Sequence, residues 1–501
     1  MKKILLLVLF FFFLLIPSRA AYDQPAINQD KIFINYGDLV KFSNSAKLEG
    51  LYGEKLKKQL NTPIIYQPSK TSTPFLSSNK LGSFFRVASW NIERGFFAWR
   101  IAEIFNYVDD LKTNPELQEQ LDEFSKASVI ILNEADIGIP RTSYENIPKK
   151  IANAFKMGYV FGTEFLEVDP YQLGVKKFTD TERVFLEQDA LNQLDNIQKE
   201  KYSGLHGTAI LTKYPILNAR IIRLPDCYSW YFEEMKKLSA IELARRGAAK
   251  TIFSEKILTE LRHGGRMALL VDLLLPNNQK ITVVGTHLEN RCLPECRVKQ
   301  LSFLLEKIKG INNPVILGGD FNTTGTDASP VTIKKEVLKR VKDPEFIVGQ
   351  AILSLTPITI VQDFAINTIN KIRNFKDPTI KHIPVILPNK ERKIFDLIKD
   401  FKFSDGVVFD VSGDSKNSFN GKSGFLGNSN ERELKGFKPT FELERPFGVA
   451  RYKLDWFFVK PYNGYAPYFG RTLEKLNRNY GKISDHDPII VDIPIGTSPI
   501  P

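Results

Sequence analysis

Apolar runs recur along this chain and alternate with polar segments. Residues 129–132 are an uninterrupted run of Val, Ile and Leu, and residues 85–90 are partly alternating. Short runs rich in β-branched and aromatic side chains predict strands, and uninterrupted runs predict strands that are buried on both faces. Further runs of this kind are residues 281–284, 314–317, 456–459 and 489–493. The pattern predicts a protein built around buried β-strands.

Polar side chains follow several of these predicted strands at the point where each one ends. Asn91 and Glu93 follow the run at residues 85–90, and Glu134 follows the run at residues 129–132. His287 follows the run at residues 281–284, and Asp320 and Asn322 follow the run at residues 314–317. Asp320 and Asn322 stand two positions apart, so both side chains can point the same way from an extended backbone. Sheet proteins place their chemistry at strand ends and in the loops beyond them.

A carboxylate also lies inside an otherwise apolar run, at Asp455 in residues 453–459. A buried carboxylate is costly unless it is paired, and a histidine is its natural partner. Of the five histidines, His287 and His486 belong to the set of strand-end residues. His486 comes directly after Asp485, and the strand predicted at residues 489–493 begins three residues later.

Each of these motifs also has a simpler interpretation. An Asn or Asp after a strand is typical of an ordinary turn, because these side chains cap turns and tolerate their geometry. His263 and His382 are interpreted as loop residues without a catalytic part. The functional interpretation therefore depends on the whole set of motifs and its order along the chain.

Seven motifs between residues 85 and 493 occur in an order that resembles the endonuclease/exonuclease/phosphatase superfamily. The motifs are Trp90-Asn91, Asn133-Glu134-Ala135-Asp136, the segment 207–215, Gly285-Thr286-His287-Leu288, Gly319-Asp320-Phe321-Asn322, Leu454-Asp455-Trp456 and Ser484-Asp485-His486. The resemblance implies an α/β fold, a four-layer α-β-β-α sandwich with two packed mixed β-sheets. It also implies metal-dependent hydrolysis of phosphoesters.

The resemblance implies a metal site and places it at Glu134. Glu134 would be the main metal ligand, with Asn91 and Asp485 nearby. Mg²⁺ prefers oxygen ligands and commonly takes only one or two carboxylates while it keeps waters and substrate phosphate. We therefore expect Mg²⁺ as the cofactor, with Mn²⁺ or Ca²⁺ as alternatives.

The resemblance also implies roles in the reaction itself. His486 would be the general base and Asp455 would hold it. Asp320 and Asn322 would orient the nucleophilic water and the phosphate, and His287 would contact the phosphate or assist the leaving oxygen. An imidazole can take a proton from water near neutral pH, and a buried carboxylate fixes its tautomer.

Arg297 and Gln300 match an R-x-x-Q segment of the family that supports the site. Two positions depart from the family pattern: Thr208 stands where many members have Asn, and Asn133 stands where Gln is usual. The histidine at position 287 resembles the secreted deoxyribonuclease and neutral sphingomyelinase branches. It differs there from the apurinic endonucleases.

The first residues set the expected compartment. Two lysines precede an unbroken apolar stretch at residues 4–16, and small residues follow at Ser18, Ala20 and Ala21. This arrangement is typical of a secretory signal peptide and is short for a membrane span. We expect residues 1–20 to be removed, which lowers the net charge from +12 to +9, and the protein to be secreted or periplasmic.

Composition and cysteine number limit the architecture. The chain has 501 residues and an ordinary globular composition, with three cysteines that allow at most one internal disulfide. We expect an N-terminal arm at residues 21–83 and one catalytic domain at residues 84–495.

Two insertions are expected within that domain, near residues 227–262 and 325–440. Residues 331–404 hold 14 Lys or Arg and 8 Asp or Glu, a local charge of +6. This charge suits an anionic substrate or a membrane surface, although a solvated basic face is equally typical. The aromatic residues 228–232 of the other insertion suit a lipid interface, stacking on bases, or a local core.

Two classes of function remain open from the sequence. The first is an exported phosphodiesterase that acts on nucleic acid or a phospholipid head group through attack of an activated water on phosphorus. The alternative is a weakly active or inactive effector that uses the fold to hold an anionic partner or a membrane. The sequence indicates no obligate protein partner, and the complete set of polar motifs favours the enzyme.

Overall fold

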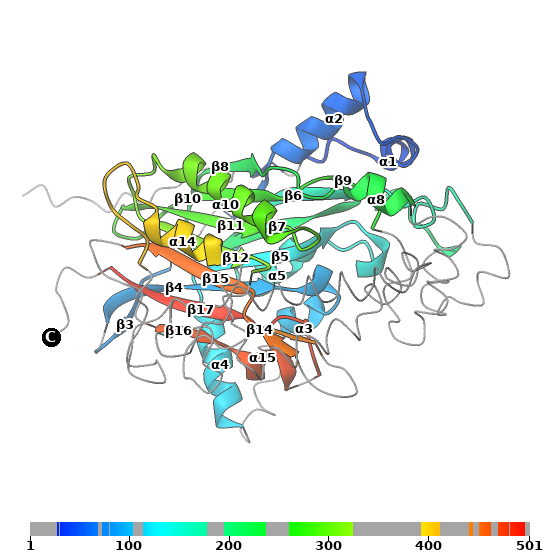
Figure 1. The fold of residues 1–501 in the computed structure, drawn as a ribbon. Helices are drawn as coiled ribbons and strands as arrows, with labels where there is room; N and C mark the ends of the chain where they lie inside the picture. The colour runs from blue at the N-terminus through cyan, green and yellow to red at the C-terminus, as the bar shows by residue number, and fades with distance from the viewer. Residues whose placement is uncertain are drawn as a thin grey trace, which may run out of the picture.

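A computed structural model shows two packed β-sheets with helices around them (Figure 1). The structure describes residues 28–29, 31–68, 73–79, 81–103, 114–177, 195–236, 260–323, 392–410, 440–443, 450–461, 469–479 and 481–495. The expected signal peptide and most of the expected insertion at residues 325–440 lie outside the described residues.

The larger sheet mixes parallel and antiparallel pairs. Its strands follow the order β1 (Asn28–Gln29), β2 (Ile64–Tyr66), β6 (Gly158–Glu167), β7 (Leu205–Thr212), β5 (Val129–Ile137), β4 (Gly82–Asn91), β17 (Ile489–Pro494) and β16 (Phe469–Thr472). In addition, β3 (Leu76–Ser78) pairs with β4, and β9 (Arg262–Gly264) pairs with β6. The central strands β4 and β5 are parallel, and β17 and β7 flank them antiparallel.

The smaller sheet is also mixed. Its order is β15 (Asp455–Lys460), β12 (Val315–Asp320), β11 (Lys280–His287), β10 (Met267–Leu274) and β8 (Ile216–Arg223). Here β11 and β12 are parallel, and the other neighbours are antiparallel. A short ladder of β13 (Phe441–Leu443) and β14 (Ala450–Tyr452) stands apart from both sheets.

The two sheets pack face to face through apolar side chains. Ile131 on β5 and Ile210 on β7 lie in one core cluster with Val283 on β11 and Ile316 on β12. Strands β4 and β5 carry apolar side chains on both faces, as the uninterrupted run at residues 129–132 predicts. The buried strands of the sequence pattern are therefore confirmed.

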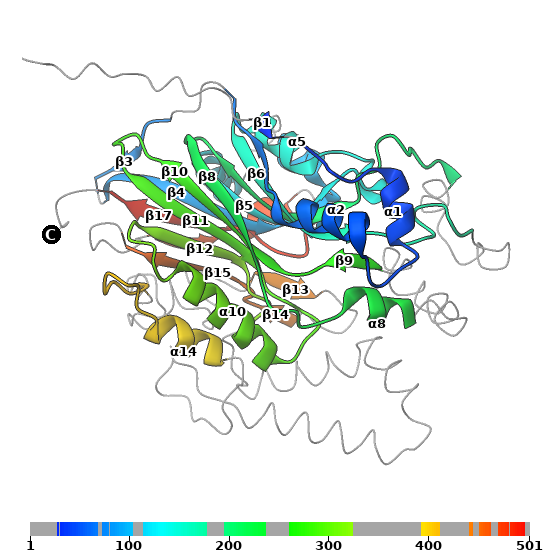
Figure 2. The same cartoon turned by 90° about the horizontal axis from the view of Figure 1, so that it is seen from above.

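Helices cover the outer face of each sheet. On the larger sheet these are α3 (Ala98–Glu103), α4 (Pro115–Ser125), α5 (Ile147–Ala154) and α15 (Glu474–Arg478). On the smaller sheet they are α10 (Pro294–Ile308) and α14 (Arg392–Asp400). Helix α10 buries Leu301, Leu304, Leu305 and Ile308, which the helical period places on one face. The expected four-layer α-β-β-α sandwich is confirmed (Figure 2).

The segment expected as an N-terminal arm folds onto the larger sheet. It contains α1 (Tyr36–Phe42), α2 (Gly50–Asn61) and β2, which pairs with β6. Leu39 and Phe42 of α1 are fully buried in the outer core of that sheet. Residues 31–66 therefore pack as part of the sandwich instead of extending from it.

A disulfide joins Cys227 to Cys296, and Cys292 is free. The bond links the start of α10 to the segment that carries α8 (Trp230–Lys236). Trp230 and Tyr231 of this segment are buried, so that part of the aromatic stretch forms a local core, whereas Phe232 is exposed. In the described part of the chain, no helix combines the length and apolar character that a membrane crossing needs.

Candidate active site

The topology brings the ends of several strands to one edge of the sandwich. Because β4 and β5 are parallel, Asn91 and Glu134 lie toward the same end of the larger sheet. Because β11 and β12 are parallel, His287 and Asp320 are paired neighbours at the end of the smaller sheet. Asn91 Nδ2 donates a hydrogen bond of 3.0 Å to Asp320 Oδ2, so the two sheet ends meet.

Two residues reach this edge from the opposite chain direction. Strand β15 runs antiparallel to β12, and its first residue, Asp455, pairs with Asp320. Strand β17 runs antiparallel to β4, so His486, shortly before its start, lies beside the end of β4. Ser484 fixes this segment: its hydroxyl donates to the Asn91 carbonyl at 2.6 Å and accepts from the His486 amide at 3.1 Å.

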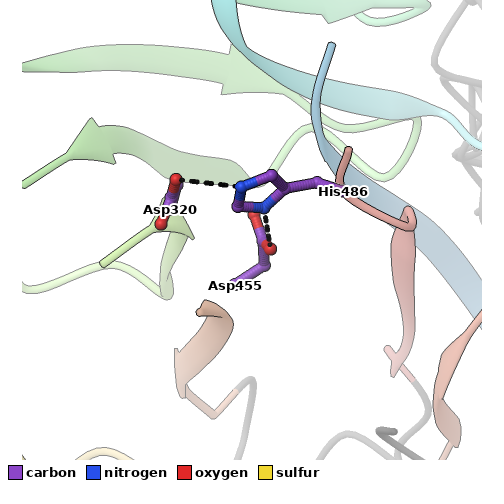
Figure 3. Close-up of side chains that lie close together, drawn as sticks. All are labelled: Asp320, Asp455 and His486. Carbon is purple, nitrogen blue, oxygen red and sulfur yellow. Dashed lines mark hydrogen bonds and ion pairs between the residues drawn. The ribbon is translucent and has the colours of Figure 1, made fainter. Parts of the chain in front are cut away.

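Asp320, Asp455 and His486 form the centre of the site (Figure 3). Nδ1 of His486 is 2.7 Å from Oδ2 of Asp455, and Nε2 is 3.7 Å from Oδ2 of Asp320. All three are buried, and one ligand atom from each lies within 4.8 Å of the others. A carboxylate can only accept, so Nδ1 carries the hydrogen and Nε2 is the nitrogen that faces Asp320.

Burial and the neighbouring charges both shift the pKa values of His486 and Asp320. Burial lowers the pKa of His486, but the carboxylates of Asp455 and Asp320 raise it well above its usual value. Burial raises the pKa of Asp320 to about 7, and Asp455 adds to this while His486 opposes it. The carboxyl group of Asp320 therefore changes its protonation state near neutral pH, whereas the ring of His486 keeps its proton to a higher pH than a free histidine does.

Two further hydrogen bonds hold Asp320, in addition to the one from Asn91. Its amide donates to Asn133 Oδ1 at 2.9 Å, and its Oδ1 accepts from the Asn322 amide at 2.8 Å. The preceding Gly319 has a φ of 133°, and a Cβ there would lie 2.0 Å from the Thr286 carbonyl oxygen. Glycine is therefore required where β11 and β12 approach each other below the site.

Glu134 adopts a backbone conformation that is uncommon for a side chain of this kind. Its φ is 56°, and the register of β5 with β7 shifts between Leu132 and Ala135. A bulge of this type redirects a side chain within a strand, and Glu134 lies inside β5, which continues to Ile137. Its carboxylate is 22% exposed, and Oε1 lies 3.4 Å from Asn91 Nδ2 and 4.0 Å from His287 Nε2.

Glu134 fits the role of an oxygen ligand for a divalent cation. Burial raises its pKa, but the positive charges of Arg94, His206 and Arg266 outweigh burial and lower it, so the carboxylate is ionised. An ionised carboxylate suits a hard ion. Asn91 turns its Nδ2 toward Glu134, and its Oδ1 accepts a hydrogen bond from the Glu93 amide. Asp320, Asp455 and His486 are the alternative metal cluster, but the 2.7 Å bond between Asp455 and His486 already engages two of its members.

His287 is held in one tautomer by an arginine. Nη1 of Arg266 donates to Nδ1 of His287 at 2.7 Å, so Nδ1 is the acceptor and Nε2 carries the hydrogen. Burial, followed by the charge of Arg266, lowers the pKa of His287 well below its usual value. Nε2 lies 3.5 Å from Asp320 Oδ2 and has no hydrogen-bond partner among the described residues. His287 is thus a neutral donor aimed into the site.

The two departures from the family pattern contact each other beneath the site. Asn133 Nδ2 donates to Thr208 Oγ1 at 2.9 Å, and the Thr208 hydroxyl donates to Glu164 Oε1 at 2.7 Å. The other oxygen of Glu164 accepts from Arg266 at 2.9 Å. The chain of bonds connects the backbone of Asp320, through Asn133, to the arginine that holds His287.

The remaining residues predicted from the sequence lie around this centre. Arg297 donates to the Glu289 carbonyl at 3.1 Å, and Gln300 accepts from the Glu289 amide at 3.0 Å, so both anchor the segment after His287. The side chain of Asn322 donates to the Leu288 carbonyl at 2.9 Å. The Asp485 amide donates to Glu93 Oε2 at 3.0 Å, and Glu93 in turn donates its amide to Asn91.

Sequence reasoning missed part of the site. Glu164 and Arg266 lie within or directly before strands, and their charge inside apolar surroundings is the signal that could have identified them. His206 precedes the Gly207-Thr208 motif and bonds to Asp136, as described below. The interpretation of His263 as a loop residue is wrong, because it lies on β9, is 7% exposed and contacts the Phe42 carbonyl at 3.0 Å.

Comparison with known proteins agrees with this architecture. Residues 88–486 match the Endonuclease/Exonuclease/phosphatase family. No curated protein matches the chain. Similar solved structures include an endonuclease/exonuclease/phosphatase from Beutenbergia cavernae DSM 12333 (14% identity, TM-score 0.36, 83% of this chain and 73% of that chain). Others are D. rerio TDP2 complexed with single strand DNA product (15%, 0.36, 82% and 98%) and the human Nocturnin catalytic domain with bound sulfate anion (13%, 0.35, 83% and 96%). The chain belongs to the Endonuclease/Exonuclease/phosphatase family, whose members hydrolyse phosphoester bonds.

Proposed function

We propose that this protein is an exported, divalent-metal-dependent phosphodiesterase that acts on nucleic acid or a phospholipid head group. The observation that carries the proposal is the bond between Asp455 and His486, with Nε2 of His486 facing Asp320. A histidine whose Nδ1 is held by a buried carboxylate presents Nε2 as a base for water.

In the proposed reaction, Nε2 of His486 removes a proton from a water molecule while the water oxygen bonds to phosphorus. Asp455 holds the ring and stabilises its positive charge, and Asp320 orients the water. Asn322 and the Nε2 hydrogen of His287 stabilise the charge that gathers on the nonbridging oxygens. The bond between phosphorus and the leaving oxygen then breaks.

We assign the metal to Glu134, Asn91 and Asp485, with Mg²⁺ preferred and Mn²⁺ or Ca²⁺ as alternatives. Bound there, the cation supplies positive charge that neutralises the phosphate and favours the deprotonated form of His486. Support comes from the ionised, partly exposed carboxylate of Glu134 and from its positive φ of 56°. Strained positions of this kind cluster at functional sites.

An anionic substrate agrees with the charge of the chain. The net charge is +12 and the sequence pI is about 9.2. Such a surplus attracts nucleic acid and anionic membrane surfaces alike. A membrane-surface contact is therefore a second part of the proposal, whereas a protein partner is not needed for the proposed reaction.

A substrate panel tests the proposed activity. Purified protein without residues 1–20 is incubated with DNA, RNA, sphingomyelin-type and phosphoinositide substrates, with Mg²⁺ or with an excess of chelator. We expect metal-dependent release of one product class, and loss of that release in His486→Ala. If the wild-type protein hydrolyses none of these substrates, the proposed activity is contradicted.

Export is tested separately. We expect the protein recovered outside the cytoplasm to begin at Ala21, because cleavage follows Ala20. Amino-terminal sequencing of the exported protein gives the answer. An intact amino terminus on the exported protein, or retention inside the cell, contradicts this part of the proposal.

A further inference from the structure

The leaving oxygen of an unactivated phosphodiester needs a proton, and His287 is poorly placed to supply it. Nδ1 of His287 accepts a hydrogen bond from Arg266, so the neutral ring holds its single hydrogen on Nε2. Loss of that hydrogen would leave an imidazolate, which is a very strong base. His287 can therefore donate a hydrogen bond to the phosphate, but the proton for the leaving group must come from another residue.

A second carboxylate–histidine pair lies beside the site. Nδ1 of His206 is 2.8 Å from Oδ1 of Asp136, and both residues are buried. Asp136 is fixed by Arg141, which donates to its two oxygens at 2.7 and 3.0 Å. Nδ1 also lies 3.4 Å from Arg141 Nη2, but that nitrogen already donates to Asp136. Nδ1 therefore donates to Asp136, and Nε2 remains for a ligand, as in the pair of Asp455 and His486.

The strand pattern turns this pair toward the site. Leu205 on β7, like Ala135 and Ile137 on β5, belongs to the core cluster on the outer face of the larger sheet. Side chains alternate along a strand, so His206 and Asp136 point to the inner face. Thr208, two residues beyond His206, already bonds to Glu164 on that face.

The order of the strands places His206 across Glu134 from His486. Along the edge of the larger sheet, β17, β4, β5 and β7 are consecutive neighbours. They bring His486, Asn91, Glu134 and His206 to that edge in this order. The electrostatic contribution of His206 to the lowered pKa of both Glu134 and His287 agrees with this proximity.

A network of charged groups from several elements begins at His206. Arg141 of η3 (Pro140–Thr142) contacts its Nδ1 side, Glu167 of β6 pairs with Arg141, and Arg262 of β9 pairs with Glu167. Phe165 stacks on the ring with the centroids 6.3 Å apart, and Arg262 lies over the same phenyl group. Only 3% of the His206 side chain is exposed, so the surrounding residues fix the orientation of the ring.

We propose that His206, positioned by Asp136, is the acid that protonates the leaving oxygen in the reaction proposed above. In-line displacement puts the attacking water and the leaving oxygen on opposite sides of phosphorus. In the row of neighbouring strands β17, β4, β5 and β7, His486 activates the water beside β17, and His206 lies on β7 at the other side of the row.

The step balances without any further reactant. The water oxygen bonds to phosphorus, and its proton goes to Nε2 of His486. His206 enters this step as an imidazolium, with one hydrogen on Nδ1 for Asp136 and one on Nε2. The bond from phosphorus to the leaving oxygen breaks, and the electron pair of that bond takes the proton from Nε2 of His206, which leaves a neutral ring. The products are a phosphomonoester and a neutral alcohol, and His486 and His206 return to their initial states by exchanging protons with water.

The dependence of the rate on the leaving group tests this assignment, which rests on the proposed phosphodiesterase function. An alkoxide needs a proton as it leaves, whereas 4-nitrophenolate does not. Wild type, His206→Gln and Asp136→Asn are assayed on bis(4-nitrophenyl) phosphate and on two alkyl diesters, a dinucleotide and a phosphorylcholine diester. The ratio of aryl to alkyl rates does not depend on how much of a variant is folded.

For His206→Gln, we expect the alkyl rate to fall by about 10²-fold or more while the aryl rate falls by less than about 10-fold. Asp136→Asn should change the ratio in the same direction. The matched control is His263→Gln, a buried histidine on β9 held by a backbone carbonyl, and it should leave the ratio unchanged. Equal losses on both substrate types in His206→Gln overturn the assignment. A wild-type protein that hydrolyses no diester overturns the proposed function itself.

Discussion

Nδ1 of His486 lies 2.7 Å from Oδ2 of Asp455, and this bond joins the two sheets of the sandwich. Asp455 begins β15 of the smaller sheet, whereas His486 precedes β17 of the larger one. The orientation of the ring therefore depends on how the sheets pack. The same core that stabilises the fold positions the proposed base.

We expect His486→Ala and Asp455→Asn to lower the turnover number by about 10²- to 10⁴-fold, the usual contribution of general acid–base catalysis. His486→Ala removes the base, and Asp455→Asn removes the charge that orients it and stabilises its protonated form. Steady-state kinetics gives the rates, and circular dichroism with thermal unfolding shows whether the fold persists.

Asp272→Asn is the matched control for Asp455→Asn. Asp272 lies on β10 and accepts a hydrogen bond from Thr282 at 2.6 Å, in the same sheet. This control should keep the wild-type rate. Rates of the His486 and Asp455 variants within a few-fold of wild type would mean that another residue is the base.

Glu134→Gln should abolish tight binding of the divalent cation and with it most of the activity. The substitution keeps the size of the side chain but removes the ionised carboxylate, which is the main ligand that a hard cation prefers. Calorimetric titration with Mg²⁺ and Mn²⁺ measures the binding directly and needs no substrate. Wild-type affinity in this variant would move the metal away from Glu134, and the cluster of Asp320, Asp455 and His486 would be examined next.

The sequence predicted the residues at strand ends correctly for a physical reason. A polar residue such as Asp320 or His287 that closes an apolar run is visible in the pattern, and parallel neighbours bring such ends together. The inner support of the site was not visible in this way. Glu164, Arg266 and His206 find their partners only through tertiary packing across strands that are distant in the sequence.

Backbone geometry also lay beyond the sequence pattern. The run at residues 129–134 predicts a regular strand that ends in a carboxylate. The structure instead continues β5 to Ile137, with a register shift in its pairing with β7 and a φ of 56° at Glu134. The disulfide was likewise undetermined, because three cysteines allow three pairings and only the fold brings Cys227 to Cys296.

Reduction of that disulfide should destabilise the protein by about 2 to 4 kcal/mol, because the bond closes a loop of 69 residues in the unfolded chain. Urea unfolding with and without a reductant measures the difference. Cys227→Ser should reproduce the effect of the reductant. Cys292→Ser is the matched control, since this cysteine is free, and it should keep the response of the wild type to reductant. Equal stability of the oxidised and reduced protein contradicts the expectation.

Neutralising Lys334, Lys335, Lys339 and Arg340, which lie outside the described residues, should weaken capture of an anionic substrate at low salt. Exposed charges are screened over about 8 to 10 Å at ordinary ionic strength, so the difference from wild type should shrink at high salt. Binding to an oligonucleotide and to anionic vesicles, each measured over a range of salt, separates the two kinds of substrate. Unchanged binding to both at low salt would show that these charges form a solvated face.

The stability of the metal-free protein should fall as the pH rises from 5 to 8. Burial raises the pKa of Asp320 from 3.8 to about 7, so the folded state binds this proton more tightly than the unfolded chain does. A raised carboxyl pKa gives stability that is complete below the unfolded value and is lost as the pH passes the folded value. The loss over this range is on the order of 2 kcal/mol.

Urea unfolding at several pH values in the presence of a chelator measures this dependence. Asp320→Asn cannot titrate and should flatten the curve, with its largest gain in stability over wild type near pH 8. His486 contributes in the same sense, because its pKa is also raised in the folded state, so part of the slope should remain in the variant. Asp272→Asn, in the same sheet but away from the site, should keep the full slope. If Asp320→Asn keeps it too, the proton is held elsewhere in the centre, and His486 rather than Asp320 dominates the titration.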